Sequence, residues 1–319
     1  MRDALLAVRD TLFDPALYWD DANQRIRDGL SDDLTQEIDV DNDGWELVAQ
    51  LDPINAFLLL SQPVLDDPAR RDQLLGDLRR LGTTLIKTFH SDGIFWGASN
   101  RKGAYGSKHV DFGHTLKSYW MLLEIDKRLP DHPFFDVATT EARAALDRAW
   151  DPTYGSWAKR PLSPTAVEYG SDWWAYAESD QLAATLSLID HRYLDQLTKT
   201  TQFWLDHYVD RGRAVREVVS SVRRDGSGWG WSDADTSKCN EWKNGYHSSE
   251  HALVLWLLGH AFAGQPATLH FAVPAAATST FIATPYFFSG RETARSVIGP
   301  VDVAGETLTA VDVTFDQVQ

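Results

Sequence analysis

Eight stretches of this 319-residue chain repeat their apolar residues at the spacing of an α-helix, and this periodicity limits the folds open to it. Short polar links alternate with longer loops rich in Gly, Pro, Asp and Ser. This alternation is typical of paired helices, so we expect a toroid of helical hairpins whose long loops and inner-helix N-termini gather at one rim. The expected helices are residues 5–30, 45–60, 69–89, 113–129, 139–150, 173–189, 194–208 and 247–262.

The pattern changes after Gly264. Residues 269–273, 278–288 and 307–315 are rich in Thr, Val, Phe and Ala in near alternation, with turn residues between them, which predicts β-strands. We therefore expect a helical catalytic domain over residues 1–264 and a β-rich tail over residues 265–319. Nothing in the tail suggests catalysis.

Composition and charge exclude several classes of protein. With 43% hydrophobic and 24% charged residues, the chain can bury a large core. Its formal charge of −16 repels nucleic acid and anionic lipid. A single cysteine, Cys239, excludes an internal disulfide framework, and the longest apolar run, residues 252–259, is too short to cross a bilayer. No secretory apolar segment opens the chain. We expect a cytoplasmic protein with no nucleic-acid or membrane partner.

Two histidines lie in aromatic surroundings. His114 follows Asp-Phe-Gly, and His247 follows Trp-Lys-Asn-Gly-Tyr at residues 242–246. Between them residues 172–178 read Asp-Trp-Trp-Ala-Tyr-Ala-Glu. Imidazole exchanges protons near neutral pH, and indole faces stack on the apolar side of a sugar ring. These clusters predict a carbohydrate-active enzyme in which Trp173, Trp174 and Trp242 face the ligand, whereas the other ten tryptophans fill the core.

The same clusters resemble, in order and spacing, three signatures of the N-acylglucosamine 2-epimerase superfamily, which includes cellobiose 2-epimerases and aldose–ketose isomerases. The matching segments are residues 113–117, 173–178 and 242–247, and residues 151–157 and Glu217 with 223–226 resemble further loops of that family. The resemblance spans residues 14–258. It implies a mainly α, (α/α)6-type toroid with a sugar pocket at its mouth and no metal or other cofactor.

The resemblance also implies that His114 and His247 transfer protons at the carbon beside the sugar's carbonyl. Two bases on opposite faces of that carbon give epimerisation, and one base that returns the proton to the neighbouring carbon gives aldose–ketose isomerisation through a cis-enediol. We expect a small-molecule sugar as the ligand. The residues expected to bind it are Trp173, Trp174, Glu178, Trp242, Lys243 and Tyr246, with Lys117, Tyr176 and Glu217 in support.

The chain departs from the family pattern at three places. Lys117 stands where the family has a Glu one turn after its His, and an ammonium beside His114 favours a neutral imidazole that serves as a base. In residues 52–59, Ala56 and Leu59 replace a third acid/base group. The family's first helices, with their substrate-binding Arg, have no counterpart, so eight helices leave a twelve-helix ring incomplete. Three explanations stay open: a partner subunit or second copy completes the ring, the β tail fills the gap, or the chain is a shortened relative with altered or lost chemistry.

Three other interpretations compete with proton transfer on a sugar. Residues 247–251 read His-x-x-Glu-His, an inverted zinc-protease pattern. Glu178 with Asp111 or Asp172 provides the paired carboxylates of a glycoside-processing enzyme. A non-catalytic carbohydrate-binding protein is the third. His109 is expected to lie in a loop off the helix face of His114, and the acidic run 39–43 lacks the last ligand of a calcium loop.

Overall fold

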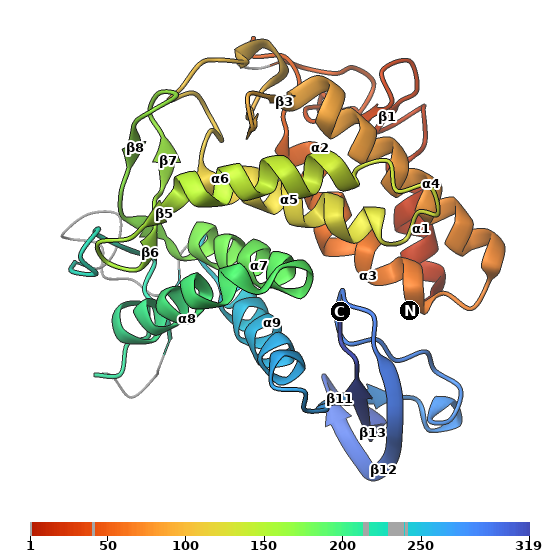
Figure 1. Cartoon of the computed structure of the whole chain (residues 1–319). Helices are drawn as coiled ribbons and strands as arrows, with labels where there is room; N and C mark the ends of the chain where they lie inside the picture. The colour runs from red at the N-terminus through yellow and green to blue at the C-terminus, as the bar shows by residue number, and fades with distance from the viewer. Residues whose placement is uncertain (1, 40–41, 213–216, 229–238, 240–241) are drawn as a thin grey trace.

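The computed structural model describes residues 2–39, 42–212, 217–228, 239 and 242–319 (Figure 1). Its helices are α1 (Arg2–Leu12), α2 (Val48–Pro53), α3 (Leu59–Ser61), α4 (Pro68–Thr84), α5 (Phe112–Asp126), α6 (Ala142–Ala149), α7 (Trp173–Ile189), α8 (Leu194–Phe203) and α9 (Tyr246–Phe262). Single π-helical turns join or extend them: η1 (Ile54–Leu58) links α2 to α3, η3 (Leu85–Phe89) extends α4, η5 (Val137–Glu141) leads into α6, and η7 (Trp204–Tyr208) extends α8.

The helices agree with the apolar periodicity except at the N-terminus. The predicted helix over residues 5–30 is wrong beyond Leu12, where α1 ends. Pro15 has no backbone N–H, and the Asp14 carboxylate accepts the N–H of Ala16 instead, so the chain turns at this point. A short hairpin of β1 (Trp19–Asp20) and β2 (Arg25–Ile26) follows.

The inner helices are α5, α7 and α9. Helix α5 packs on α7, and α7 packs on α9. Helices α5 and α7 are buried on nearly every face, as expected of helices whose sequences are apolar all round. In contrast, α6 and α8 bury a single stripe and lie alongside as outer partners. Helix α6 thus contacts α5, and α8 contacts α7, so neighbouring helices pack in pairs (Figure 1).

Short hairpins crowd the ends of these helices. They are β3–β4 (His90–Ser91, Ile94–Phe95), β5–β6 (Trp150–Asp151, Ser156–Trp157) and β7–β8 (Arg160–Pro161, Val167–Glu168). A further antiparallel pair joins β9 (Ser171–Asp172) to β10 (Ser221–Val222), which follows α7 and α8 in the chain. Strand β9 runs directly into α7, and the backbone N–H of Trp173 donates to Ser220 O at 2.9 Å. The pairing of β9 with β10 therefore fixes where α7 begins.

The tail is a three-stranded antiparallel sheet in the order β11-β13-β12, built from β11 (Ala267–Val273), β12 (Arg291–Val303) and β13 (Glu306–Asp316). Two of the expected strands are confirmed, but the one over residues 278–288 is wrong. That segment contains Pro285, which cannot donate to a sheet, and it forms a turn. Strand β12 was not predicted, because Gly299, Pro300 and its mostly exposed side chains hide the alternation.

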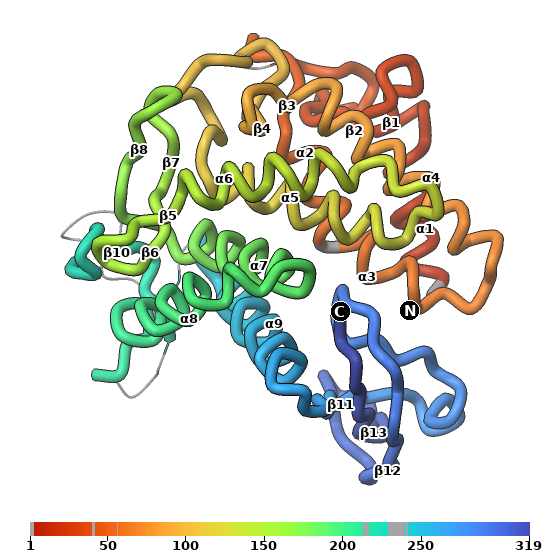
Figure 2. The backbone as a smooth tube through the Cα atoms, in the orientation of Figure 1, coloured from red at the N-terminus to blue at the C-terminus, as the bar shows by residue number. Residues whose placement is uncertain are grey.

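The tail shares its core with the helices. Phe287, Phe288, Val311, Val313 and Phe315 are buried within the main hydrophobic cluster. Its backbone returns toward the helical body before the chain ends (Figure 2).

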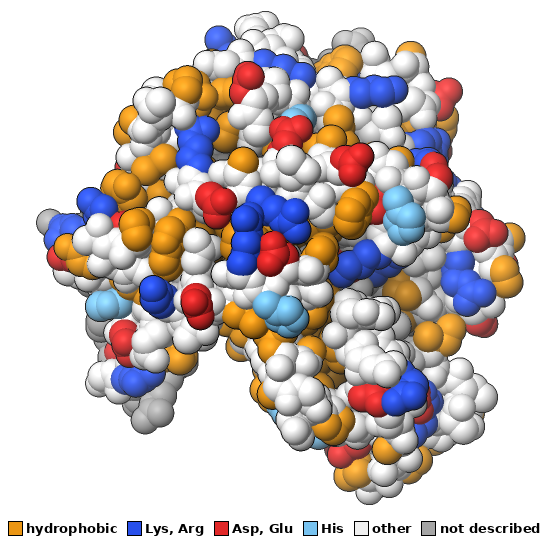
Figure 3. All heavy atoms as spheres, viewed as in Figure 1, with side chains coloured by type: hydrophobic (Ala, Val, Ile, Leu, Met, Phe, Trp, Pro, Cys, Tyr) orange, Lys and Arg blue, Asp and Glu red, His pale blue; other side chains and the backbone are white. Residues whose placement is uncertain are grey.

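Among the helices that the structure describes, none combines the length and apolar character of a membrane crossing. On the face drawn in Figure 3, acidic and basic side chains are interspersed.

Candidate functional site

The N-terminal turns of α5, α7 and α9 supply the histidines and carboxylates of the site. Asp111 and His114 lie at the start of α5, Trp174 and Glu178 in the first turns of α7, and His247 in the first turn of α9. Because these three inner helices pack in series, residues more than a hundred positions apart in sequence come together.

Asp111 holds His114 in place by two contacts. It is the N-cap of α5: its Oδ1 accepts the backbone N–H of His114 at 2.7 Å, and its Oδ2 lies 2.7 Å from Nδ1 of the same residue. Burial would raise the pKa of Asp111, but the charge and hydrogen bonds of His114 outweigh it and lower the pKa below its ordinary value. With Nδ1 engaged, Nε2 is the nitrogen left for chemistry. The His114 side chain keeps 13% exposure to solvent.

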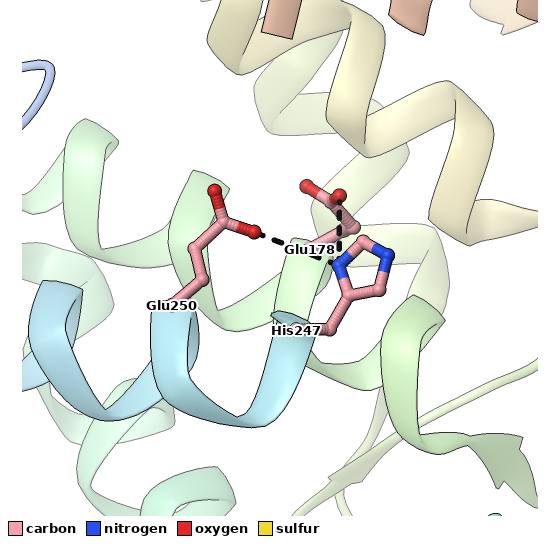
Figure 4. A group of neighbouring side chains, drawn as sticks. All are labelled: Glu178, His247 and Glu250. Carbon is pink, nitrogen blue, oxygen red and sulfur yellow. Dashed lines mark ion pairs between the residues drawn. The ribbon is translucent and has the colours of Figure 1, made fainter. Parts of the chain in front are cut away.

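Two carboxylates flank His247 (Figure 4). Nδ1 of this imidazole lies 3.6 Å from Oε1 of Glu178 and 3.5 Å from Oε2 of Glu250. Both carboxylates are almost fully buried, whereas the His247 side chain is 19% exposed. The imidazole therefore has buried acidic groups behind it and an edge that solvent reaches.

The indole of Trp174 borders both imidazoles. Its ring centroid lies 4.7 Å from that of His114 and 6.2 Å from that of His247. Gly113 makes this approach possible, because a Cβ there would lie 2.5 Å from the indole and 2.7 Å from the Ala175 side chain. The glycine before His114 is thus required by the packing of α5 against α7.

The Lys117 side chain forms an ion pair with Glu178. Its Nζ lies 3.7 Å from Glu178 Oε1 and 3.4 Å from Asp52 Oδ1. Burial would lower the pKa of Lys117, but Glu178, Asp52 and Glu250 together raise it, so the side chain is an ammonium. Burial and the nearby Glu250 raise the pKa of Glu178, and Lys117 opposes them. The neighbour expected to act on His114 therefore acts mainly on the carboxylates.

A second buried lysine lies beside Trp173. The Lys243 side chain is fully buried, with Nζ 5.3 Å from the Trp173 ring centroid and 3.6 Å from Glu217 Oε1. The same Glu217 oxygen accepts the Ser248 hydroxyl at 3.2 Å and the Val218 N–H at 2.8 Å. Trp173 is 3% exposed, and its ring lies 6.3 Å from His247. Lys243 and Glu217 thus back the His247 side of the site.

The remaining predicted residues have different surroundings. Tyr246 stacks edge-on against His247 at 5.0 Å and is 41% exposed. Trp242 is 74% exposed. Tyr176 is in the core: its hydroxyl donates to Thr200 O at 2.9 Å, and its ring packs on Phe203. The structure therefore gives Tyr176 a packing contact in place of a site contact.

Several residues of the site were not singled out from the sequence. Asp52 faces Lys117, and Tyr286 of the tail donates to Glu250. His109, expected only as a loop residue, lies with its ring 4.9 Å from that of His114. Burial, together with His114, lowers the pKa of His109. No periodicity connects these residues with the helices they touch, and only the folded chain brings them together.

Within the described part of the chain, Glu178, His247 and Glu250 have the spacing of a metal site, since one donor atom from each lies within 4.8 Å of the others. Lys117 already supplies a positive charge beside this group.

The inverted zinc-protease pattern does not assemble, because the His251 side chain points elsewhere. Its Nε2 lies 2.7 Å from the buried Asp180, which also accepts the Trp157 N–H and the Thr200 hydroxyl.

Comparison with solved structures finds the same arrangement of helices in sugar-converting enzymes. The structure of a D-mannose isomerase matches with a TM-score of 0.63 and 18% identity over 80% of this chain and 66% of its own. The fold is that of sugar isomerases and epimerases. The cellobiose 2-epimerase of Spirochaeta thermophila DSM 6192 matches at 0.61 with 20% identity over 80% of this chain and 64% of its own.

The cellobiose 2-epimerase of Bacillus thermoamylovorans B4167 matches at 0.61 with 13% identity over 80% of this chain and 66% of its own. The chain thus spans a little under two thirds of the length of these structures. No protein-family model matches, and no curated protein matches by sequence. The shared fold supports the resemblance to the N-acylglucosamine 2-epimerase superfamily drawn from the motifs.

Proposed function

We propose that this chain is a sugar epimerase or aldose–ketose isomerase in which His114 and His247 move protons at the carbon beside the carbonyl. One observation carries the proposal: two partly exposed imidazoles, each backed by carboxylates, border a single indole. An indole wall suits the apolar face of a sugar ring, and imidazole titrates near neutral pH. Because Glu178 and Glu250 are almost fully buried behind His247, a role in holding the imidazole suits them better than attack on a glycosidic bond.

The chemistry then follows from the positions of the two rings. One imidazole takes the proton from C2 of the open-chain sugar, the electrons of that C–H bond form the C1–C2 double bond, and the carbonyl oxygen gains a proton, which gives an enediol. A proton delivered to the opposite face of C2, with loss of the proton from the C1 hydroxyl, restores the carbonyl and gives the epimer. A proton returned to C1, with loss of the proton from the C2 hydroxyl, gives the ketose.

Exchange of the C2 proton in deuterated water tests the proposal, with D-mannose and cellobiose as probes. We expect exchange in the wild type and a fall of about 10²- to 10⁴-fold in His114→Ala and His247→Ala, the usual effect of removing a general acid or base. His270→Ala is the control, because His270 lies on β11 and is 77% exposed.

The outcomes separate the competing functions. Bond cleavage without exchange indicates a glycoside-processing enzyme. Sugar binding with neither exchange nor cleavage indicates a carbohydrate-binding protein. Unchanged exchange in either histidine variant contradicts the assigned roles.

A further inference from the structure

One turn of the C-terminal tail reaches the carboxylates beside His247. It lies between η8 (Ala275–Ala277) and β12. The hydroxyl of Tyr286 in this turn donates to Oε1 of Glu250 at 2.6 Å, and the other oxygen of that carboxylate faces Nδ1 of His247. Burial and Glu250 raise the pKa of Tyr286, so its hydroxyl stays protonated and remains a donor.

The next residue of the turn reaches the second carboxylate through an indole. The ring of Phe287 packs on Trp120 with centroids 5.1 Å apart, and Trp120 Nε1 donates to Glu178 Oε2 at 2.7 Å. The other oxygen of Glu178 faces the same nitrogen of His247. Two adjacent tail residues thus connect to the two carboxylates that flank one imidazole nitrogen.

The backbone of this turn is strained and firmly held. Tyr286 has φ of +63°, a left-handed conformation that a bulky side chain rarely adopts. Arg128, in the turn that follows α5, donates to Phe287 O at 2.9 Å, and Phe287 and Phe288 are 2% and 3% exposed. Strain of this kind persists only where the surroundings fix it, and it commonly marks functional sites.

We infer that Tyr286 is a positioning residue of the site, which holds Glu250 and through it His247, and that the tail is therefore part of the catalytic unit. This inference rests on the proposed function. The groups around Glu250 are Tyr246 and His247 on α9, Glu178 on α7, Lys117 on α5 and Tyr286 on the tail.

Tyr286→Phe tests the inference because it keeps the buried ring and removes only the hydroxyl. We expect kcat for C2 exchange to fall about 10- to 100-fold with KM little changed, the range for loss of a hydrogen bond to a charged group. Phe287→Leu, which thins the packing on Trp120, is expected to lower kcat less. Tyr154→Phe is the matched control, because Tyr154 is 45% exposed on the turn between β5 and β6.

A double-mutant cycle with Glu250→Gln separates positioning from a general loss of stability. If Tyr286 acts through Glu250, Tyr286→Phe has little further effect in the Glu250→Gln background. Additive losses of kcat, or a Tyr286→Phe variant as active as the wild type, overturn the inference. Absence of exchange in the wild type overturns the proposed function instead. In that case sugar binding is measured by calorimetry in the wild type and in Tyr286→Phe, and a loss of binding in the variant shows that the turn serves the site.

Discussion

At the scale of single residues, each imidazole depends on the carboxylate beside it. Asp111 both caps α5 and binds Nδ1 of His114, whereas Glu178 and Glu250 approach Nδ1 of His247 at distances longer than a hydrogen bond. His114 is thus held in orientation by its carboxylate, whereas neither carboxylate beside His247 makes a hydrogen bond to its Nδ1.

Substitutions at Asp111 separate its two contacts. Asp111→Ala is expected to lower the free energy of unfolding by about 1 kcal/mol, since the N-cap is lost, and Asp111→Asn is expected to preserve it. Both variants should lose most of the exchange activity, because neither leaves a carboxylate on Nδ1. Urea unfolding and C2 exchange measure the two effects. Wild-type activity in Asp111→Asn would show that the carboxylate charge is not needed.

Removal of the charge of Lys117 is expected to make stability depend on pH. Lys117 opposes the rise in the pKa of Glu178 that burial causes, so this pKa rises further in Lys117→Met. A buried acid whose pKa is raised above its value in the unfolded chain costs stability in full above the folded pKa. This cost shrinks as the pH falls and disappears below the unfolded pKa. We expect a loss of about 3 kcal/mol at pH 8 and a smaller loss at pH 5.

Urea unfolding at both pH values measures this difference. Lys127→Met is the control, because Lys127 caps the C-terminal end of the same helix and forms a more exposed pair with Glu124. An equal loss at both pH values in Lys117→Met would mean that Glu178 does not depend on the ammonium.

At the scale of elements, the contact between α5 and α7 depends on one missing side chain. We expect Gly113→Ala to destabilise the protein by about 1–3 kcal/mol, because the added methyl overlaps Trp174 and Ala175. Gly76→Ala on α4 is the matched control, since nothing lies within 4 Å of its added Cβ, and it is expected to stabilise by about 0.5–1 kcal/mol. Thermal unfolding and C2 exchange are the measurements. A Gly113→Ala variant as stable and active as the wild type would show that the two helices adjust freely.

The helices could be predicted because apolar periodicity is a local property, and α7 begins and ends where the pattern does. The positions of His114, Trp174 and His247 at inner-helix N-termini also followed from their motifs. Tyr286 could not be found in this way. Its partner Glu250 is 36 residues away on another element, and the turn that carries it resembled a strand. Contacts made by turns and loops depend on tertiary packing, which the apolar periodicity of the sequence does not predict.

At the scale of the whole molecule, the helical body and the tail share one hydrophobic core, although residue 264 divides them by composition. We therefore expect a single cooperative transition in calorimetry of the full chain. Phe287→Leu and Asp111→Ala, in different parts, should both shift that one transition. Two separate transitions, with only one moved by each variant, would mean that residues 1–264 and 265–319 fold as independent domains.

Because both imidazoles border the indole of Trp174, variants of this residue cannot report on one imidazole alone. Any replacement of Trp174 changes the surroundings of both imidazoles together. Losses measured in Trp174 and histidine variants are therefore expected to overlap and not to multiply. Assigning one ring to uptake and the other to delivery of the proton will require stereospecifically labelled substrates, since mutagenesis of their common wall reports only on the pair.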